Sequence, residues 1–143
     1  MIIDLVKNVE DAVIPKLATE GSAGADLCAV NDVLLYPGET KLIKTGINIS
    51  IPPGYAGFVC SRSGLALKQN VFVLNAPGIV DSDYTGDVGV ILHNASEDRF
   101  TIKKGDRVAQ LLIVKCENFV FNEVQELNKT ERGDGGFGST GHK

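Results

Sequence analysis

Tryptophan is absent from this 143-residue chain, and cysteine and histidine are scarce, with three and two residues respectively. The cysteines Cys28, Cys60 and Cys116 are far apart and form no C-x-x-C pair, which argues against a zinc site. Each cysteine lies in an apolar run. We therefore expect three buried free thiols, as in the proteins of a reducing compartment.

Long hydrophobic runs are also missing, and none approaches the roughly 20 residues that a membrane-spanning helix needs. The first residues, MIIDLVKNVED, lack the charged and then apolar order of a secretory signal. We therefore expect an intracellular, soluble protein with no membrane partner. It would act in the cytoplasm or nucleus of a cell or, if it is virus-encoded, in the host cell.

Basic residues are outnumbered, with 14 Lys and Arg against 18 Asp and Glu and a net charge of −4. Non-specific electrostatic binding to nucleic acid needs a basic surface, so no nucleic-acid partner is expected. A small anionic ligand remains compatible with this charge if a few Arg and Lys side chains gather at one site. The length predicts one domain with a substantial core.

The apolar residues fall in short, β-rich runs separated by Gly- and Pro-containing turns. The runs are Ile2–Val6, Val33–Tyr36, Lys41–Ile43, Ile47–Ile51, Tyr55–Cys60, Val71–Leu74, Val88–Leu92, Phe100–Ile102, Val108–Cys116 and Phe119–Phe121. Many short strands with turns about every 8–12 residues predict an all-β sandwich or barrel. One short helix is expected at Ser63–Lys68, with a serine at its start.

The composition changes after about Asn128, where the apolar periodicity stops and five of the sixteen glycines fall in Gly133–Gly141. This end reads RGDGGFGSTGHK and is close to a phosphate-binding P-loop, but His142 stands where the P-loop requires Lys. Such a segment cannot bury enough surface to fold alone. We expect residues 1–128 to form the β-barrel and residues 129–143 to stay mobile until a ligand orders them.

Two stretches in the first half of the chain could bind an anion. Ser61-Arg62-Ser63-Gly64-Leu65 offers hydroxyls, a guanidinium and backbone N–H groups at a helix start, although a simple N-cap with a surface arginine would look the same. Ala23-Gly24-Ala25-Asp26-Leu27 taken alone favours a strand entered through a glycine turn, with Asp26 capping or pairing locally.

A third stretch, Asn75–Asp87, crowds acids around a predicted hairpin, and a solvated turn would explain most of it. Asp81, however, follows an apolar run, so it can border a pocket and act as a general base toward water. Tyr84 offers a flat face for a sugar or base, and Asn75 offers a donor and an acceptor for a base edge.

The remaining two stretches are Gly105–Leu111, which by itself reads as the start of a strand with Gln110 facing solvent, and the glycine-rich tail. In order along the chain, the five stretches AGADL, SRSGL, NAPGIVDSDYTGDV, GDRVAQL and RGDGGFGSTG resemble the five motifs of the trimeric dUTP pyrophosphatase (dUTPase) family. The resemblance implies a jelly-roll-like β-fold, a homotrimer with active sites shared between subunits, and a tail that closes over the site as a lid.

The resemblance also implies a reaction and its residues. Asp81 would activate the water that attacks the α-phosphorus of dUTP, giving dUMP and pyrophosphate. Mg²⁺ would be held by the triphosphate and water rather than by direct protein ligands, with Asp26 near its water shell. The implied uracil and deoxyribose contacts are Asn75, Gly78, Ile79, Val80, Tyr84 and Phe137. The implied phosphate contacts are Ser61, Arg62, Ser63, Gly64, Gln110, Arg132, Gly138, Ser139 and Thr140.

Two other functions fit parts of this pattern. A dCTP deaminase has a similar fold, but it needs a further acid at the base, and the tail favours the dUTPase interpretation. A regulatory protein could use nucleotide-dependent ordering of the tail as a switch. Such a sensor would have no need of Asp81 and Phe137, which are both present. Nucleotide turnover separates these alternatives.

Overall fold

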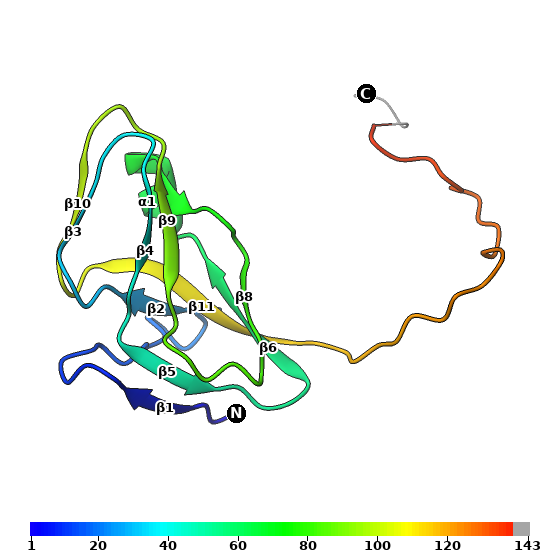
Figure 1. The fold of residues 1–143 in the computed structure, drawn as a ribbon, viewed down its shortest axis with the longest axis horizontal. Helices are drawn as coiled ribbons and strands as arrows, with labels where there is room; N and C mark the ends of the chain where they lie inside the picture. The colour runs from blue at the N-terminus through cyan, green and yellow to red at the C-terminus, as the bar shows by residue number, and fades with distance from the viewer. Residues whose placement is uncertain (139–143) are drawn as a thin grey trace.

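The computed structural model describes residues 1–138 and builds them almost entirely from short β-strands, with one short helix (Figure 1). The elements are β1 (Asp4–Lys7), β2 (Ala25–Cys28), β3 (Val33–Leu35), β4 (Thr40–Ile43), β5 (Ile47–Ser50), β6 (Tyr55–Cys60), α1 (Ser63–Gln69), β7 (Val71–Val73), β8 (Gly78–Val80), β9 (Val90–Asn94), β10 (Phe100–Ile102) and β11 (Arg107–Lys115). The predicted all-β, jelly-roll-like class is confirmed.

The described strands pair in four antiparallel sheets. The largest has the order β2-β11-β6-β8, and a second has the order β4-β9-β7. Two-stranded ribbons, β1-β5 and β10-β3, complete the body. Because β11 lies between β2 and β6, three segments that are far apart in the sequence become neighbours at its N-terminal end.

The core is made of aliphatic side chains that the strands point inward at every second position. In β9, for example, Val90 and Leu92 are completely buried while Ile91 is half-buried. Burying one such side chain stabilises the fold by about 1.5–3 kcal/mol. Two polar residues, Thr45 and Asn94, are also buried, and each donates a hydrogen bond to a backbone carbonyl, that of Val88 and that of Leu35 respectively.

Helix α1 is a surface turn between β6 and β7. It is one residue longer than predicted, and its N-cap is Arg62, which is extended and gives no side-chain cap, rather than a serine. It ends at Asn70, a left-handed residue (φ 51°) whose N–H donates to the carbonyl of Leu65. The helix buries no residue, and no helix in residues 1–138 has the length and apolar character to cross a membrane.

Two expectations are corrected. Phe119–Phe121 is not a strand: both phenylalanines are exposed and stack edge to face, and the described chain after β11 runs away from the body (Figure 1). A strand needs a partner edge, and this segment pairs with none of the described residues. The three cysteines are free, as predicted, but only Cys28 is buried; Cys60 and Cys116 are half-buried.

Candidate functional site

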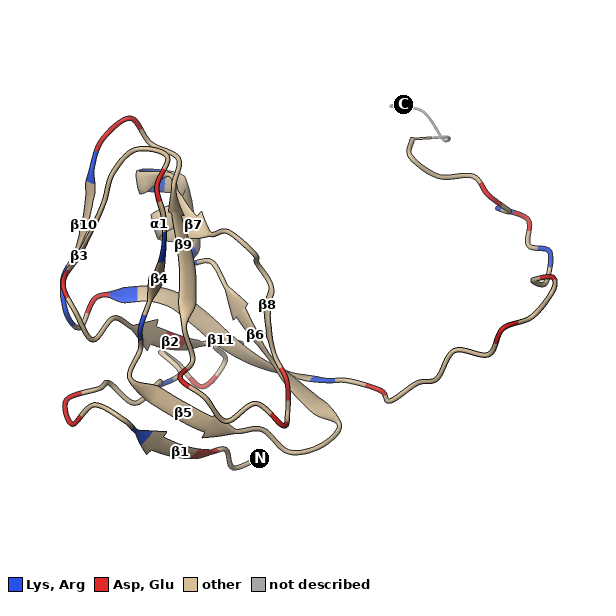
Figure 2. Ribbon diagram, viewed as in Figure 1, with Lys and Arg blue, Asp and Glu red and all other residues tan. Residues whose placement is uncertain are grey.

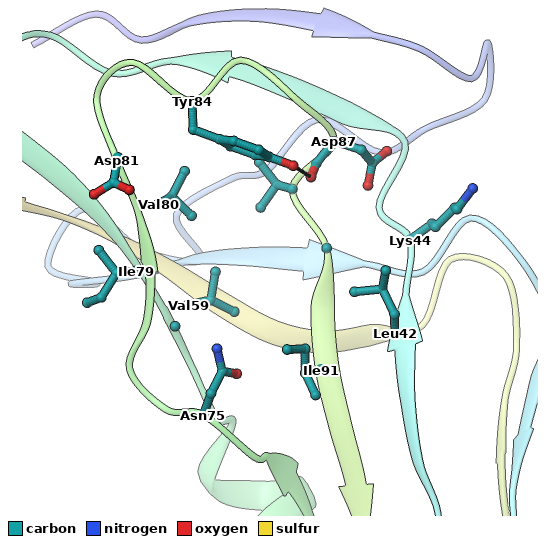
Figure 3. Close-up of a pocket in the computed structure, with 13 residues that line it drawn as sticks. Leu42, Lys44, Val59, Asn75, Ile79, Val80, Asp81, Tyr84, Asp87 and Ile91 are labelled. Carbon is teal, nitrogen blue, oxygen red and sulfur yellow. Dashed lines mark hydrogen bonds between the residues drawn. The ribbon is translucent and has the colours of Figure 1, made fainter.

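A cavity of about 380 Å³ opens between β8 with its following loop and the β4-β9 strand pair; we call it the hairpin cavity (Figure 3). Six residues that the sequence singled out line it, namely Asn75, Gly78, Ile79, Val80, Asp81 and Tyr84. The structure therefore brings together every predicted base and sugar contact except Phe137.

Strand alternation places Asp81 at the rim of this cavity. In β8, Gly78 and Val80 are buried against the body, whereas Ile79 and then Asp81 are exposed. Ile79 and Asp81 also line a second groove on the other side of β8, so the carboxylate borders both spaces. It is therefore open to water and to a ligand that enters from outside the chain.

Gly78 and Asn75 form the end of the cavity nearest α1. A Cβ on Gly78 would stand 3.0 Å from Nδ2 of Asn75 and 3.4 Å from Cβ of Val59. Glycine thus lets the amide of Asn75 lie close to the backbone of β8. This arrangement leaves a side-chain amide and strand backbone groups side by side, the donors and acceptors that a flat heterocyclic ring requires.

Tyr84 forms the opposite end of the cavity and is fixed by its own loop. Its hydroxyl donates to the carbonyl of Asp87 at 3.0 Å (Figure 3). Its ring lies over Gly86, where a Cβ would approach the tyrosine oxygen to 2.5 Å. With 47% of its surface exposed, the ring offers one face to whatever occupies the cavity.

The far wall of the cavity was missed by sequence reasoning. Leu42 and Lys44 come from β4 and the residue after it, and Gly89 and Ile91 come from β9 and its approach. Leu42 is 61% exposed, and its Cδ1 occupies the space that a Cβ on Gly89 would need, at 2.6 Å. In the sequence Leu42 looks like an ordinary strand residue, and only the β4-β9 pairing reveals its place.

Four predicted residues and Arg107 gather at the N-terminal end of β11; we call Asp26, Arg62, Arg107, Gln110 and Ser61 the arginine cluster. One carboxylate oxygen of Asp26 is 3.0 Å from Nε of Arg62, and the other is 3.2 Å from Nη1 of Arg107. Arg62 also donates to the backbone carbonyl of Arg107 at 3.1 Å. Arg107 was not predicted as a site residue, because its sequence context indicates only a strand start.

Gln110 and Ser61 tie this cluster to the sheet. Gln110 lies opposite Asp26 on one side and Cys60 on the other, and its side-chain amide donates to the carbonyl of Ser61 at 2.9 Å. The hydroxyl of Ser61 accepts the N–H of Val73 at 2.9 Å. Gln110, which its own stretch taken alone would place facing solvent, is thus half-buried and hydrogen-bonded. Ser63 and Gly64, the two residues after Arg62, are exposed.

Asp81 and the arginine cluster lie at opposite ends of β6, whereas the other end of the hairpin cavity, at Gly78, pairs with Val59. Val80 pairs with Gly57, so Asp81 adjoins the start of β6, whereas Arg62 follows its end. At about 3.3 Å per residue, Asp81 and Arg62 are separated by about 20 Å along the strand. Figure 2 shows the same division, with the basic start of β11 and the acidic loop after β8 on different sides of the body.

The tail joins neither group. Arg132 folds back on its own loop, and its Nε donates to the carbonyl of Gly135 at 2.8 Å. Phe137 and Gly138 are exposed, and the described part of the tail runs away from the body (Figure 1). Ser139 and Thr140 lie outside the described residues, so their predicted phosphate contacts stay predictions.

Within residues 1–138, no group of three or more His, Cys, Asp or Glu side chains could hold a metal ion. Both carboxylate oxygens of Asp26 face arginine nitrogens instead. Burial raises the pKa of the nearby Cys28 thiol, and the charge of Asp26 adds to this rise. A divalent cation at this site would therefore have to arrive with its own oxygen ligands.

Three comparisons with known proteins agree. The family model described as dUTPase matches residues 10–141. The deoxyuridine 5'-triphosphate nucleotidohydrolase of Clostridium kluyveri is 49% identical over 138 residues, 96% of each chain. A mutant dUTPase of Staphylococcus bacteriophage 80alpha, solved with dUpNHpp, has a TM-score of 0.92 at 28% identity over 98% of each chain. The structure of a mutant dUTPase from phage phi11 of S. aureus has a TM-score of 0.84 at 26% identity, over 90% of this chain and all of that one. That structure is described as showing how a structural Mg(II) ion is coordinated.

Proposed function

The chain belongs to the dUTPase family and is a dUTP diphosphatase, and we propose that Asp81 activates the water that its reaction consumes. The observation that carries this proposal is the position of Asp81 at the rim of the hairpin cavity, exposed to water. The activated water attacks the α-phosphorus, dUMP and pyrophosphate separate, and Asp81 holds the proton that the water loses. The reaction removes dUTP before uracil enters DNA and supplies dUMP for thymidylate synthesis.

The hairpin cavity binds uracil and deoxyribose. The amide of Asn75 and the backbone of Gly78, Ile79 and Val80 read the edge of the base, much as an added strand would. The space between the Asn75 amide and the β8 backbone is too narrow for the methyl group of thymine. Cytosine is rejected because its hydrogen-bond donor and acceptor are exchanged relative to those of uracil. Tyr84 packs under the deoxyribose and leaves no room for a 2′-hydroxyl. Phe137 of the tail stacks on the uracil face.

The arginine cluster binds the triphosphate. Arg62 and the exposed Ser63 and Gly64 provide a guanidinium, a hydroxyl and backbone N–H groups for phosphate oxygens. Arg132, Gly138, Ser139 and Thr140 of the tail add contacts to the terminal phosphate. The substrate is Mg·dUTP, in which the triphosphate and water hold the Mg²⁺ ion. This fits a chain whose described residues offer no metal cage.

The separation of the two groups supports a site shared between subunits of a homotrimer. A triphosphate whose α-phosphorus lies at Asp81 cannot also reach Arg62 of the same chain, about 20 Å away along β6. Each complete site therefore combines the hairpin cavity of one subunit with the arginine cluster of a second. The tail reaches over this site from a third subunit. A glycine-rich loop that acts as a lid in this way needs no helix after it, unlike a P-loop.

The test is turnover with Mg²⁺ and dUTP, dTTP, dCTP or UTP, each followed by chromatography of nucleotide and pyrophosphate. We expect rapid conversion of dUTP alone. Asp81→Asn should bind dUTP normally but lose about 10³-fold in kcat, because it removes the base at constant size. Binding of dUTP by the wild-type protein without turnover would favour a regulatory protein, and release of ammonia from dCTP would favour a deaminase. An active Asp81→Asn enzyme would contradict the role of Asp81.

A further inference from the structure

The loop between β8 and β9, which carries Tyr84, is tied to a different part of the barrel by side-chain amides and a carboxylate. Three residues make these ties: Asn8, just after β1, Asn48 in β5, and Asp87 in the loop itself. None of these three residues belongs to the arginine cluster. Asp87 lines the hairpin cavity, but the reaction as described gives it no part.

Asp87 is the centre of this network. Its Oδ2 accepts the N–H of Gly46 at 3.1 Å and the side-chain amide of Asn8 at 2.9 Å. Its backbone forms an isolated bridge with Asn48. Asp87 is therefore held by a backbone N–H and a side-chain amide, which fixes its main chain as well as its side chain. The carbonyl of that main chain accepts the Tyr84 hydroxyl.

Asn48 holds the other side of the tyrosine. Its Nδ2 donates to the carbonyl of Thr85 at 2.7 Å, and its Oδ1 accepts from the amide of Asn8 at 2.5 Å. The residues on both sides of Gly86 are thus anchored to β5. The tyrosine ring lies over Gly86, between the two anchors.

We propose that Asn48 and Asp87 are positioning residues that set the preference of the enzyme for dUTP over UTP. They do so by holding Tyr84 where it closes the space beside the sugar. This inference rests on the proposed placement of deoxyribose against Tyr84. Without the anchors, the exposed loop gains conformational freedom, and the tyrosine must be ordered each time substrate binds. If Tyr84 can move aside in this way, the site also accepts the 2′-hydroxyl group of UTP.

The experiment compares Asn48→Ala with Asn94→Ala, using the full chain. Asn94 is the control because its amide, like that of Asn48, donates to backbone carbonyl groups, here those of Leu35 and Asp98, but at the other end of β9. We expect Asn48→Ala to lower the ratio of kcat/KM for dUTP over UTP by about tenfold, mainly because kcat/KM for UTP rises. Hydrogen exchange of residues 81–89 should accelerate in this variant alone. Asn94→Ala should lower Tm without changing the ratio.

Two further variants separate a positioning role from a structural one. Gly86→Ala places a methyl group against the Tyr84 hydroxyl and should lower the same ratio while every anchor remains. Asp87→Asn keeps an acceptor for Gly46 and Asn8 and should restore most of the selectivity that Asp87→Ala loses. An unchanged ratio in Asn48→Ala and Gly86→Ala would overturn the inference, as would an equal fall in Asn94→Ala. Wild-type turnover of dUTP is measured first, so a failure of the proposed function would appear there, before any variant is compared.

Discussion

The hairpin cavity and the arginine cluster are built from different interactions. The cavity has apolar walls, and its loop is held by hydrogen bonds from amides, a hydroxyl and the backbone. The arginine cluster is held by one carboxylate shared between two guanidinium groups, which are partly exposed. Each half has the construction that its proposed part of the nucleotide requires: a fixed shape for the base and sugar, and charge for the triphosphate.

The difference also separates stability from function. Partly exposed ion pairs contribute at most about 1 kcal/mol each to stability. We therefore expect Asp26 mainly to orient Arg62 and Arg107 for the proposed phosphate contacts, rather than to hold the barrel together. The hairpin cavity, by contrast, continues directly into the core, since Val80 and Val88 belong to both. Changes there should affect shape recognition, and changes in the cluster should respond to charge and salt.

The largest expected effect comes from inactivating the hairpin cavity in one subunit and the arginine cluster in another. Asp81→Asn and Arg62→Ala should each reduce activity by at least about 100-fold. Coexpressed in equal amounts, the two variants form mixed trimers in which about a quarter of the sites combine an intact Asp81 with an intact Arg62. We expect about a quarter of wild-type activity, measured as pyrophosphate release.

The control for this mixture is Asp81→Asn coexpressed with the double variant Asp81→Asn, Arg62→Ala, which cannot form an intact site in any arrangement. Mixed trimers that stay inactive would mean that both halves act within one chain. That result would contradict the shared site but would leave the role of each residue intact.

Removing the tail should have the next largest effect. Deletion of residues 133–143 removes Phe137 and every proposed tail phosphate contact except Arg132, while leaving both halves unchanged. We expect kcat/KM for dUTP to fall by about 100-fold, because lid closure excludes water and completes the site. Sedimentation should still give a trimer. Full activity of the shortened protein would contradict the lid, and a monomer would mean that the tail also holds the assembly together.

A smaller effect is expected from Asp26→Asn, which tests the arginine cluster alone. The substitution keeps the size of the side chain but leaves Arg62 and Arg107 without their shared counter-charge. We expect kcat to fall by about tenfold because the guanidinium groups lose their orientation. Pyrophosphate should bind no more weakly, because the cluster gains one positive charge. Asp83→Asn, a change in the exposed loop near Tyr84, is the matched control. An unchanged kcat in Asp26→Asn would show that the arginines orient themselves.

Much of the fold could be read from the sequence, because turn residues mark the ends of the strands. The runs Tyr55–Cys60 and Phe100–Ile102 match β6 and β10 at both ends. β9 instead begins two residues later than predicted and ends at Asn94, a polar residue that is buried because its amide is fully hydrogen-bonded. Phe119–Phe121 has strand composition but no partner within the described chain.

The site was predictable to the extent that it lies in continuous motifs. Asn75, Asp81 and Tyr84 do share one cavity, and Asp26, Arg62 and Gln110 do meet at β11. Leu42, Arg107 and the anchors of the Tyr84 loop were missed, because their roles come from contacts between strands that are distant in the sequence. The distance between the two halves was also missed, since it depends on the register of β6 with β8.

The smallest expected effect tests the missed wall of the hairpin cavity. Leu42→Ala should raise KM for dUTP about threefold and leave kcat unchanged, because it widens the space beside Gly89 without touching Asp81. Tm should barely change, since Leu42 is already 61% exposed. Leu67→Ala, which truncates a leucine on α1 that is 83% exposed, should change neither value. Pyrophosphate binding should stay normal in Leu42→Ala, in contrast to changes in the arginine cluster. If KM did not respond, β4 would be only a neighbour of the base site, and shape recognition would belong to β8 and its loop alone.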